Sequence, residues 1–204
     1  MKIQLERYHG LGNDYLVYDP NKNEMELNKR NVKALCNRNM GLGADGILEG
    51  PLLGEKQMAV RIWNPDGSIA GKSGNGVRIF AKYLKDADYV QKKNYLLKTD
   101  GGMVEITYLN EVGSRLRVSM GTLSFLSNDI PVIGEQREVI NEDMVFGKNL
   151  YPATCVSIGN PHCVIPMKEI SRELVCKIGE YSECARYFPE RINTEIMQVT
   201  DSEN

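Results

Sequence analysis

The stretch S-G-N-G at 73–76 has the clearest potential for chemistry, because an amphipathic helix is predicted directly after it. One face of that helix is apolar, at Val77, Phe80, Ala81 and Leu84. The start of a helix carries roughly half a positive charge and about four backbone N–H groups without intrahelical partners. Such a turn suits a carboxylate or a phosphate. Equally, Ser73 or Asn75 can be an ordinary helix N-cap, and the local pattern favours neither interpretation.

Asparagine recurs at predicted turns, at Asn13, Asn64, Asn75, Asn160 and Asn193. Each one alone is typical of a turn, since asparagine tolerates left-handed backbone and bonds its own main chain. Together they offer neutral donors and acceptors to a zwitterionic ligand. His162 follows the turn Gly159-Asn160-Pro161. From spacing alone, a strand-end histidine bonded to the backbone is favoured at this position.

The stretch G-L-G-A-D-G at 41–46 has the glycine spacing of a dinucleotide-binding loop. That function needs a strand before the loop and a helix after it. Here a helix is predicted before the loop and a strand after it, so we interpret the stretch as a connecting loop.

Composition excludes several classes of partner. The 204 residues carry a net charge of −2, with 42% hydrophobic and 25% charged residues, which is typical of a soluble globular protein. There is no basic surplus for nucleic acid or an anionic membrane, and no apolar run near the roughly 20 residues of a membrane span. Without a signal-peptide core, the N-terminus predicts a cytoplasmic protein. Five cysteines without C-x-x-C, and two histidines, predict neither a disulfide framework nor a metal site.

Hydrophobic periodicity predicts a mixed α/β chain. Helices are expected in 27–39, 71–84 and 171–188, with Asn28 and Ser171 as N-caps and with Val32, Leu35 and Cys36 facing inward. Strands are expected in 2–10, 15–20, 46–50, 57–64, 95–110, 116–121, 151–167 and 192–201. The polar stretch 124–148 reads as an irregular crossing between two lobes. We therefore place the domains at 1–123 and 124–204.

A weak internal repeat relates two Gly-Asn turns, each of which leads into an apolar strand. The two copies are G-N-D-Y-L-V-Y from Gly12 and G-N-P-H-C-V-I from Gly159. The step from Asn13 to Asn75, taken again from Asn160, reaches beyond residue 204. If the repeat is genuine, a second copy of the S-G-N-G turn and its helix is expected there.

Six stretches occur in the order and at the approximate spacing of one known family. They are HGLGNDYLVYD, GLGADGIL, WNPDGS, SGNGVRIFAKY, VSIGNPHCVI and FPERIN. Over essentially its whole length the chain resembles diaminopimelate epimerase, a family of cofactor-independent amino-acid isomerases. The resemblance implies an α/β (α+β) fold of two pseudo-symmetric lobes, each a curved, mostly antiparallel sheet around a central helix. It also implies that the second lobe is incomplete in these residues.

The resemblance implies how such a protein works without a cofactor. Removing the α-proton of an amino acid builds negative charge next to its carboxylate. Two helix N-termini directed at that carboxylate stabilise the charge. In the family, two cysteines face each other and exchange the proton, one as thiolate and one as thiol. The pKa of a free thiol is about 8.5, and a helix N-terminus lowers it.

The resemblance also assigns roles to individual residues. The family's substrate-binding positions match Asn13, Asn64, Gly74, Asn75, Asn160 and Asn193. Gly74 and Asn75 are expected to offer main-chain donors to the reacting carboxylate, and the other asparagines to bind the polar ends of the substrate. His162 matches a histidine that assists proton transfer or orientation, and we treat it as a catalytic candidate together with Ser73.

Two departures from the family qualify these roles. Ser73 stands where the family has its first catalytic cysteine, and a serine hydroxyl is a poor base unless a neighbour activates it. The family's second catalytic cysteine lies in a Cys-Gly-Thr-Gly turn that the 204 residues do not contain, so we expect these residues alone not to epimerise diaminopimelate. Cys163 is close to the site, but we interpret it as a small buried hydrophobe.

Three functions therefore compete. The first is interconversion of LL- and meso-diaminopimelate in lysine biosynthesis, independent of pyridoxal phosphate. The second, favoured by Ser73, is a related racemase or a dehydratase with another amino acid as substrate. The third is a catalytically inactive fragment or binding protein. In each case we expect a small amino-acid ligand, no cofactor, no metal, and no nucleic-acid or membrane partner; a homodimer remains open.

Overall fold

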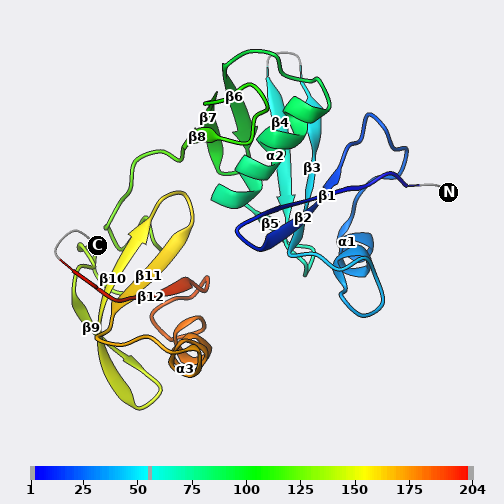
Figure 1. Ribbon diagram of the computed structural model, residues 1–204. Coiled ribbons are helices and arrows are strands. Elements are labelled where there is room, and N and C mark those ends of the chain that lie inside the picture. Colours follow the sequence, from blue (N-terminus) through cyan, green and yellow to red (C-terminus); the bar gives the residue numbers. More distant parts are fainter. Residues whose placement is uncertain (1–2, 55–56, 202–204) are drawn as a thin grey trace. The chain divides into compact units, whose positions relative to one another are not determined.

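The computed structural model describes residues 3–54 and 57–201 (Figure 1). The helices are α1 (Lys29–Cys36), α2 (Gly74–Asp86) and α3 (Arg172–Ser182). The strands are β1 (Glu6–Gly10), β2 (Asn13–Tyr18), β3 (Gly46–Leu53), β4 (Met58–Trp63), β5 (Ile69–Ala70), β6 (Asn94–Thr99), β7 (Gly102–Tyr108), β8 (Leu116–Ser119), β9 (Glu142–Phe146), β10 (Asn149–Ser157), β11 (Pro161–Pro166) and β12 (Asn193–Met197). Within the described ranges, no helix has the length and apolar character to cross a membrane.

The chain forms two compact units, Met1–Met120 and Gly121–Asn204. The first holds an eight-stranded sheet in the order β1-β2-β3-β4-β6-β7-β8, with β5 paired to β4. The second holds a four-stranded sheet in the order β12-β11-β10-β9. Most neighbouring strands are antiparallel, while β2–β3, β4–β6 and β11–β12 are parallel. This arrangement confirms the predicted mixed α/β class.

Helix α2 is the central element of the first unit and lies against its curled sheet (Figure 1). The apolar face predicted from the sequence is fully buried, at Val77, Phe80, Ala81 and Leu84. Their partners come from β2, β3, β4, β6 and β7, so the helix is enclosed by strands that are far apart in sequence. Burial of this face fixes where the N-terminal end of α2 lies relative to β2.

Helix α1 begins as predicted, with Asn28 as its N-cap. The Asn28 side chain accepts the N–H groups of Arg30 and Asn31, and the Asn31 side chain returns a bond to the Asn28 N–H. The 41–46 stretch then joins this helix to β3, which confirms the connecting-loop interpretation. Because no helix follows these glycines, they do not form a dinucleotide-binding turn.

The stretch 124–148 differs from its predicted irregular form. It contains β9, whose alternate residues Met144 and Phe146 are buried while Asp143 and Val145 are exposed. Ile130, Val132 and Val139 also enter the core of the second unit. Isolated apolar residues in a polar stretch gave too weak a period to reveal the strand.

The repeated Gly-Asn turns sit in the same local topology. In the first unit β1 and β2 form a hairpin, and α1 leads into β3, which pairs parallel to β2. In the second unit β10 and β11 form a hairpin, and α3 leads into β12, which pairs parallel to β11. Gly12 (φ 85°) and Gly159 (φ 97°) both take the left-handed backbone that these turns need.

Candidate active site

Ser73 closes the N-terminus of α2. Its extended backbone (φ −145°, ψ 119°) lets its Oγ accept the Gly76 N–H at 3.0 Å. Within the described ranges, the N–H groups of Gly74 and Asn75 have no hydrogen-bond acceptor. Ser73 is therefore the N-cap, and two donors of the same turn stay available for an anion.

Tyr15 of β2 lies against this cap and is not among the residues predicted from the sequence. Its hydroxyl is 3.4 Å from Ser73 Oγ, and the residue is only 7% exposed. Burial raises the pKa of the Tyr15 phenol above its ordinary value. Gly46 makes room for the ring: a Cβ there would lie 2.5 Å from the Trp63 carbonyl oxygen and 2.6 Å from Tyr15 Cε1. The one available signal was the place of Tyr15 in the Gly-Asn repeat.

Asn13, at the start of β2, is held by a charged cluster. Its Nδ2 donates to Asp45 Oδ2 at 3.2 Å, and that oxygen also accepts the Asp14 N–H at 3.0 Å. Arg38 bridges Asp14 and Asp45 at 2.7 Å each. Burial acts to raise the pKa of Asp45, but the Asp14 N–H and the Arg38 guanidinium outweigh it, so that pKa lies below its usual range. Asp45 thus stays ionised and orients the Asn13 amide.

Asn64 follows β4 and shapes the next turn. Its backbone N–H donates to the Ser68 carbonyl at 2.8 Å, and its Nδ2 donates to Ser68 Oγ at 2.9 Å. Tyr15 pairs with Gly46, and Ile47 pairs with Trp63, so Asn13 and Asn64 lie at the same end of three neighbouring strands. Because Tyr15 touches Ser73, the N-terminus of α2 lies near this end too.

The remaining predicted residues gather in the second unit. His162 and Asn193 are direct partners in the parallel pair β11–β12. His162 Nδ1 lies 2.7 Å from Glu195 Oε1, and Asn193 Nδ2 donates to the Pro161 carbonyl at 2.9 Å. Asn160, in the preceding turn, accepts the Ile158 N–H at its carbonyl. The expectation that His162 bonds the backbone is therefore wrong, because its partner is a carboxylate 33 positions away in sequence.

Cys163 is placed as a core residue. It pairs directly with Cys155 across β10 and β11, and both are fully buried. The hydrogen bond with Cys155 and burial strongly raise the pKa of the Cys163 thiol. A thiol held neutral in this way is a poor proton acceptor at neutral pH.

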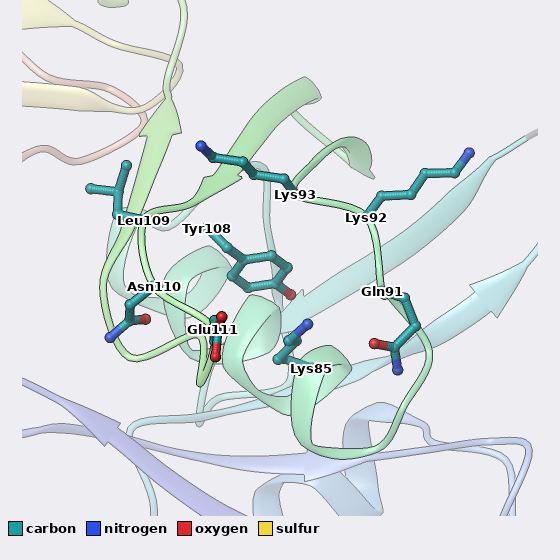
Figure 2. Close-up of a pocket in the computed structure, with 8 residues that line it drawn as sticks. All are labelled: Lys85, Gln91, Lys92, Lys93, Tyr108, Leu109, Asn110 and Glu111. Carbon is teal, nitrogen blue, oxygen red and sulfur yellow. The ribbon is translucent and has the colours of Figure 1, made fainter.

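Two cavities of the first unit lie apart from these residues. One, of about 310 Å³, is lined by Lys85 and Tyr108 near the C-terminal end of α2. Figure 2 shows Lys92 and Lys93 extending away from Tyr108, so the lysines do not converge on a common point. The other, of about 550 Å³, lies along β1 and the outer side of α2. None of the predicted site residues lines either cavity.

Comparison with known proteins adds the following similarities. A family model described as diaminopimelate epimerase matches residues 7–126. Diaminopimelate epimerase 2 of Nostoc sp. is 46% identical over 200 residues, which cover 98% of this chain and 70% of the relative. Diaminopimelate epimerase of Synechococcus elongatus is 34% identical over 203 residues, which cover 98% of this chain and 72% of the relative.

Solved structures show the same fold at low sequence identity. A hydroxyproline epimerase from Agrobacterium vitis, with bound trans-4-hydroxy-L-proline, superposes with a TM-score of 0.59 at 13% identity over 86% of this chain. A probable proline racemase from Agrobacterium radiobacter gives a TM-score of 0.60 at 14% identity over 87% of this chain. The chain spans 52% and 53% of the length of these two structures.

Proposed function

The chain belongs to the diaminopimelate epimerase family, an isomerase family, and on that premise we propose that it interconverts LL- and meso-diaminopimelate by proton transfer at Cα. The reaction belongs to lysine biosynthesis, and we propose a cytoplasmic setting without pyridoxal phosphate. The observation that carries the proposal is the open turn at the start of α2. There, the Gly74 and Asn75 N–H groups have no acceptor among the described residues.

This turn supplies what deprotonation at Cα requires. Loss of the α-proton delocalises negative charge into the adjacent carboxylate. Two backbone donors at a helix N-terminus stabilise that charge without reorganising, because the helix already holds them in place. Lowering the barrier by about 1.4 kcal/mol increases the rate tenfold, so a few hydrogen bonds to the developing charge can change the rate by orders of magnitude.

The asparagines supply neutral polar contacts to the rest of the substrate. In this proposal, Asn13 and Asn64 at one end of the first sheet, and Asn160 and Asn193 in the second unit, bind the polar ends of a zwitterionic amino acid. The Asp45–Arg38 cluster supports Asn13, because an amide already bonded on one side is oriented on the other. The Glu195 carboxylate orients His162 in the same manner.

Ser73 supports a second candidate function. A hydroxyl at the place of the family's first catalytic cysteine is a weaker acid and base than a thiol. One-sided proton chemistry on another amino acid, such as dehydration, is the alternative that this residue favours. A protein that binds an amino acid without turnover is the third outcome.

The test uses the full-length gene product with diaminopimelate in deuterated solvent. Deuterium entry at Cα and net inversion are measured separately, and calorimetry records binding. We expect exchange and inversion in the parent and their loss in Ser73→Ala. Binding without exchange would instead support the inactive binding protein, and exchange with elimination would support the dehydratase.

Ser171→Ala is the matched control. Ser171 caps α3 as Ser73 caps α2, with its Oγ accepting the Leu174 N–H at 3.1 Å. Both variants lose one serine N-cap, which costs about 1 kcal/mol of stability. Turnover should fall in Ser73→Ala alone; equal loss in both variants would show that the effect comes from capping.

A further inference from the structure

The contact between Tyr15 and Ser73 raises a question about where the protons lie. The two oxygens are 3.4 Å apart, and either can be the donor by distance alone. Ser73 Oγ also accepts the Gly76 N–H at 3.0 Å. The environment of Tyr15 decides the direction.

Tyr15 needs an acceptor for its hydroxyl proton. The residue is 7% exposed, and buried hydroxyls are almost always hydrogen-bonded. Among the described residues, Ser73 Oγ is the hydrogen-bond partner of this hydroxyl. Burial also keeps the phenol protonated, because it raises its pKa. Tyr15 therefore donates to Ser73.

A serine oxygen that accepts two bonds must direct its own proton elsewhere. The hydroxyl has two lone pairs and one hydrogen, and both acceptor directions are taken by Gly76 and Tyr15. Any negative charge that develops on Oγ is then stabilised by two donors and by the positive end of α2. The arrangement makes Ser73 a better acid than an isolated serine.

We propose that Tyr15 is a positioning residue that turns Ser73 into a proton donor, an inference that rests on the proposed function. In the reprotonation step, the electron pair at the substrate Cα takes the Ser73 hydroxyl proton, so a C–H bond forms and the O–H bond breaks. The hydrogen bonds from the Tyr15 hydroxyl and the Gly76 N–H stabilise the Oγ anion until water returns a proton to it. These two donors bring Ser73 closer to the acid strength of the thiol it replaces, which when free has a pKa of about 8.5.

The internal repeat supports this role for Tyr15. Tyr15 and His162 each stand two residues after the asparagine of a Gly-Asn turn. Each also pairs with the first residue of the following parallel strand, Gly46 of β3 or Asn193 of β12. The same register position therefore carries a proton-bearing side chain in both units.

The first test removes the Tyr15 hydroxyl in two backgrounds. In the parent, Tyr15→Phe should slow deuterium entry at Cα by about tenfold to a hundredfold, the range expected for one hydrogen bond to a developing charge. In Ser73→Cys the same change should cost less than about threefold, because a thiol supplies its own acidity. Equal losses in both backgrounds would mean that Tyr15 is merely structural and would overturn the proposal.

Tyr95→Phe is the matched control for loss of a buried hydroxyl. The Tyr95 hydroxyl lies 3.1 Å from that of Tyr108, in the same unit but away from Ser73. This variant should leave exchange within about twofold in both backgrounds. A loss as large as that of Tyr15→Phe would count against a specific role for Tyr15.

The second test needs no turnover. The thiol introduced by Ser73→Cys is alkylated with iodoacetamide at a series of pH values, and the modified peptide is followed by mass spectrometry. Adding Tyr15→Phe should raise the pKa of this thiol and slow its alkylation at pH 7 by about twofold to threefold, in line with the small loss of exchange expected in this background. An unchanged titration would overturn the inference. A shifted titration without exchange in either the parent or Ser73→Cys would instead count against the proposed function.

Discussion

The two units share a β-β-α-β frame but carry different titratable side chains at the equivalent position. In the first unit the repeat position holds Tyr15, which is 7% exposed and faces a serine at a helix start. In the second it holds His162, whose side chain is 24% exposed and faces the Glu195 carboxylate. Burial raises the pKa of the Tyr15 phenol, so this side chain stays protonated at neutral pH. The same backbone position thus carries a different side chain with a different hydrogen-bond partner in each unit.

The bonds that hold an asparagine near each Gly-Asn turn also differ between the units. Asn13 is fixed by an ionised cluster of Asp14, Arg38 and Asp45, while Asn193 is fixed by one bond to a backbone carbonyl. Ion pairs therefore surround Asn13, whereas Asn193 is exposed.

Ser73→Cys should give the largest effect and remove most of the asymmetry. General acid–base catalysis contributes about 10²–10⁴-fold, so epimerase turnover should rise by up to that factor if diaminopimelate is the substrate. The measurement compares deuterium entry with net inversion in parent and variant. Equal and high inversion by both would show that position 73 does not carry the proton. Turnover near zero in both, with a changed native activity, would point to another reaction.

Asp19 makes the stability of the first unit sensitive to acid. Its buried carboxylate accepts the Tyr83 and Tyr89 hydroxyls at 2.5 and 2.8 Å. Burial opposes ionisation, but these bonds outweigh it and hold the pKa of Asp19 below its usual value. A carboxyl with a lower pKa when folded stabilises the fold above its unfolded pKa of about 3.9, and that stability is lost as the pH falls through the folded pKa.

Asp19→Asn should therefore flatten this pH dependence and lower stability at neutral pH by about 1.5–3 kcal/mol. Fluorescence of Trp63, the single tryptophan, reports unfolding of the first unit. The buried polar residues described in the second unit are Ser127 and Ser182, which carry no charge. If the free energy of unfolding of Asp19→Asn falls at low pH as steeply as that of the parent, Asp19 is not the acid-sensitive group.

Gly46→Ala and Asn193→Ala test whether the equivalent positions carry equal constraints. A Cβ at Gly46 meets a backbone carbonyl and the Tyr15 ring, so the variant should cost about 1–3 kcal/mol and displace Tyr15. Asn193 is exposed, and Asn193→Ala should stay within about 0.5 kcal/mol. Trp63 fluorescence follows the first variant, and alkylation of the buried pair Cys155 and Cys163 follows the second. Similar losses in both would contradict the difference between the turns.

The two serine caps should give the smallest difference in stability. Ser73→Ala and Ser171→Ala each remove one bond to a first-turn N–H and should each cost about 1 kcal/mol. Trp63 fluorescence measures the loss of stability in Ser73→Ala, and alkylation of Cys155 and Cys163 measures it in Ser171→Ala. A much larger cost at Ser73 would show that its contact with Tyr15 contributes to folding as well as to chemistry.

Much of the fold could be predicted because its determinants are local. The period of Val77, Phe80, Ala81 and Leu84 marked the buried face of α2, and Asn28 and Ser171 were recognisable caps, whereas Ser73 and Asn75 were both open as the cap of α2. The order of helix, glycine loop and strand around 41–46 excluded a dinucleotide turn. Six ordered motifs led to the family. Each of these depends on residues a few positions apart, where backbone geometry alone sets the relation.

Strand register and packing decided the rest. Tyr15 and Ser73 lie 58 positions apart, and His162 and Glu195 lie 33 apart. Nothing in the local spacing of either pair predicts contact, because a shift of one residue in a strand would turn the side chain to the opposite face of the sheet. The absence of a side chain at Gly46 admits the Tyr15 ring, and burial of α2 brings Ser73 to its hydroxyl. The sequence alone determined that a small polar turn begins this helix; only the tertiary structure decided that Ser73 is its cap and that Tyr15 lies against it.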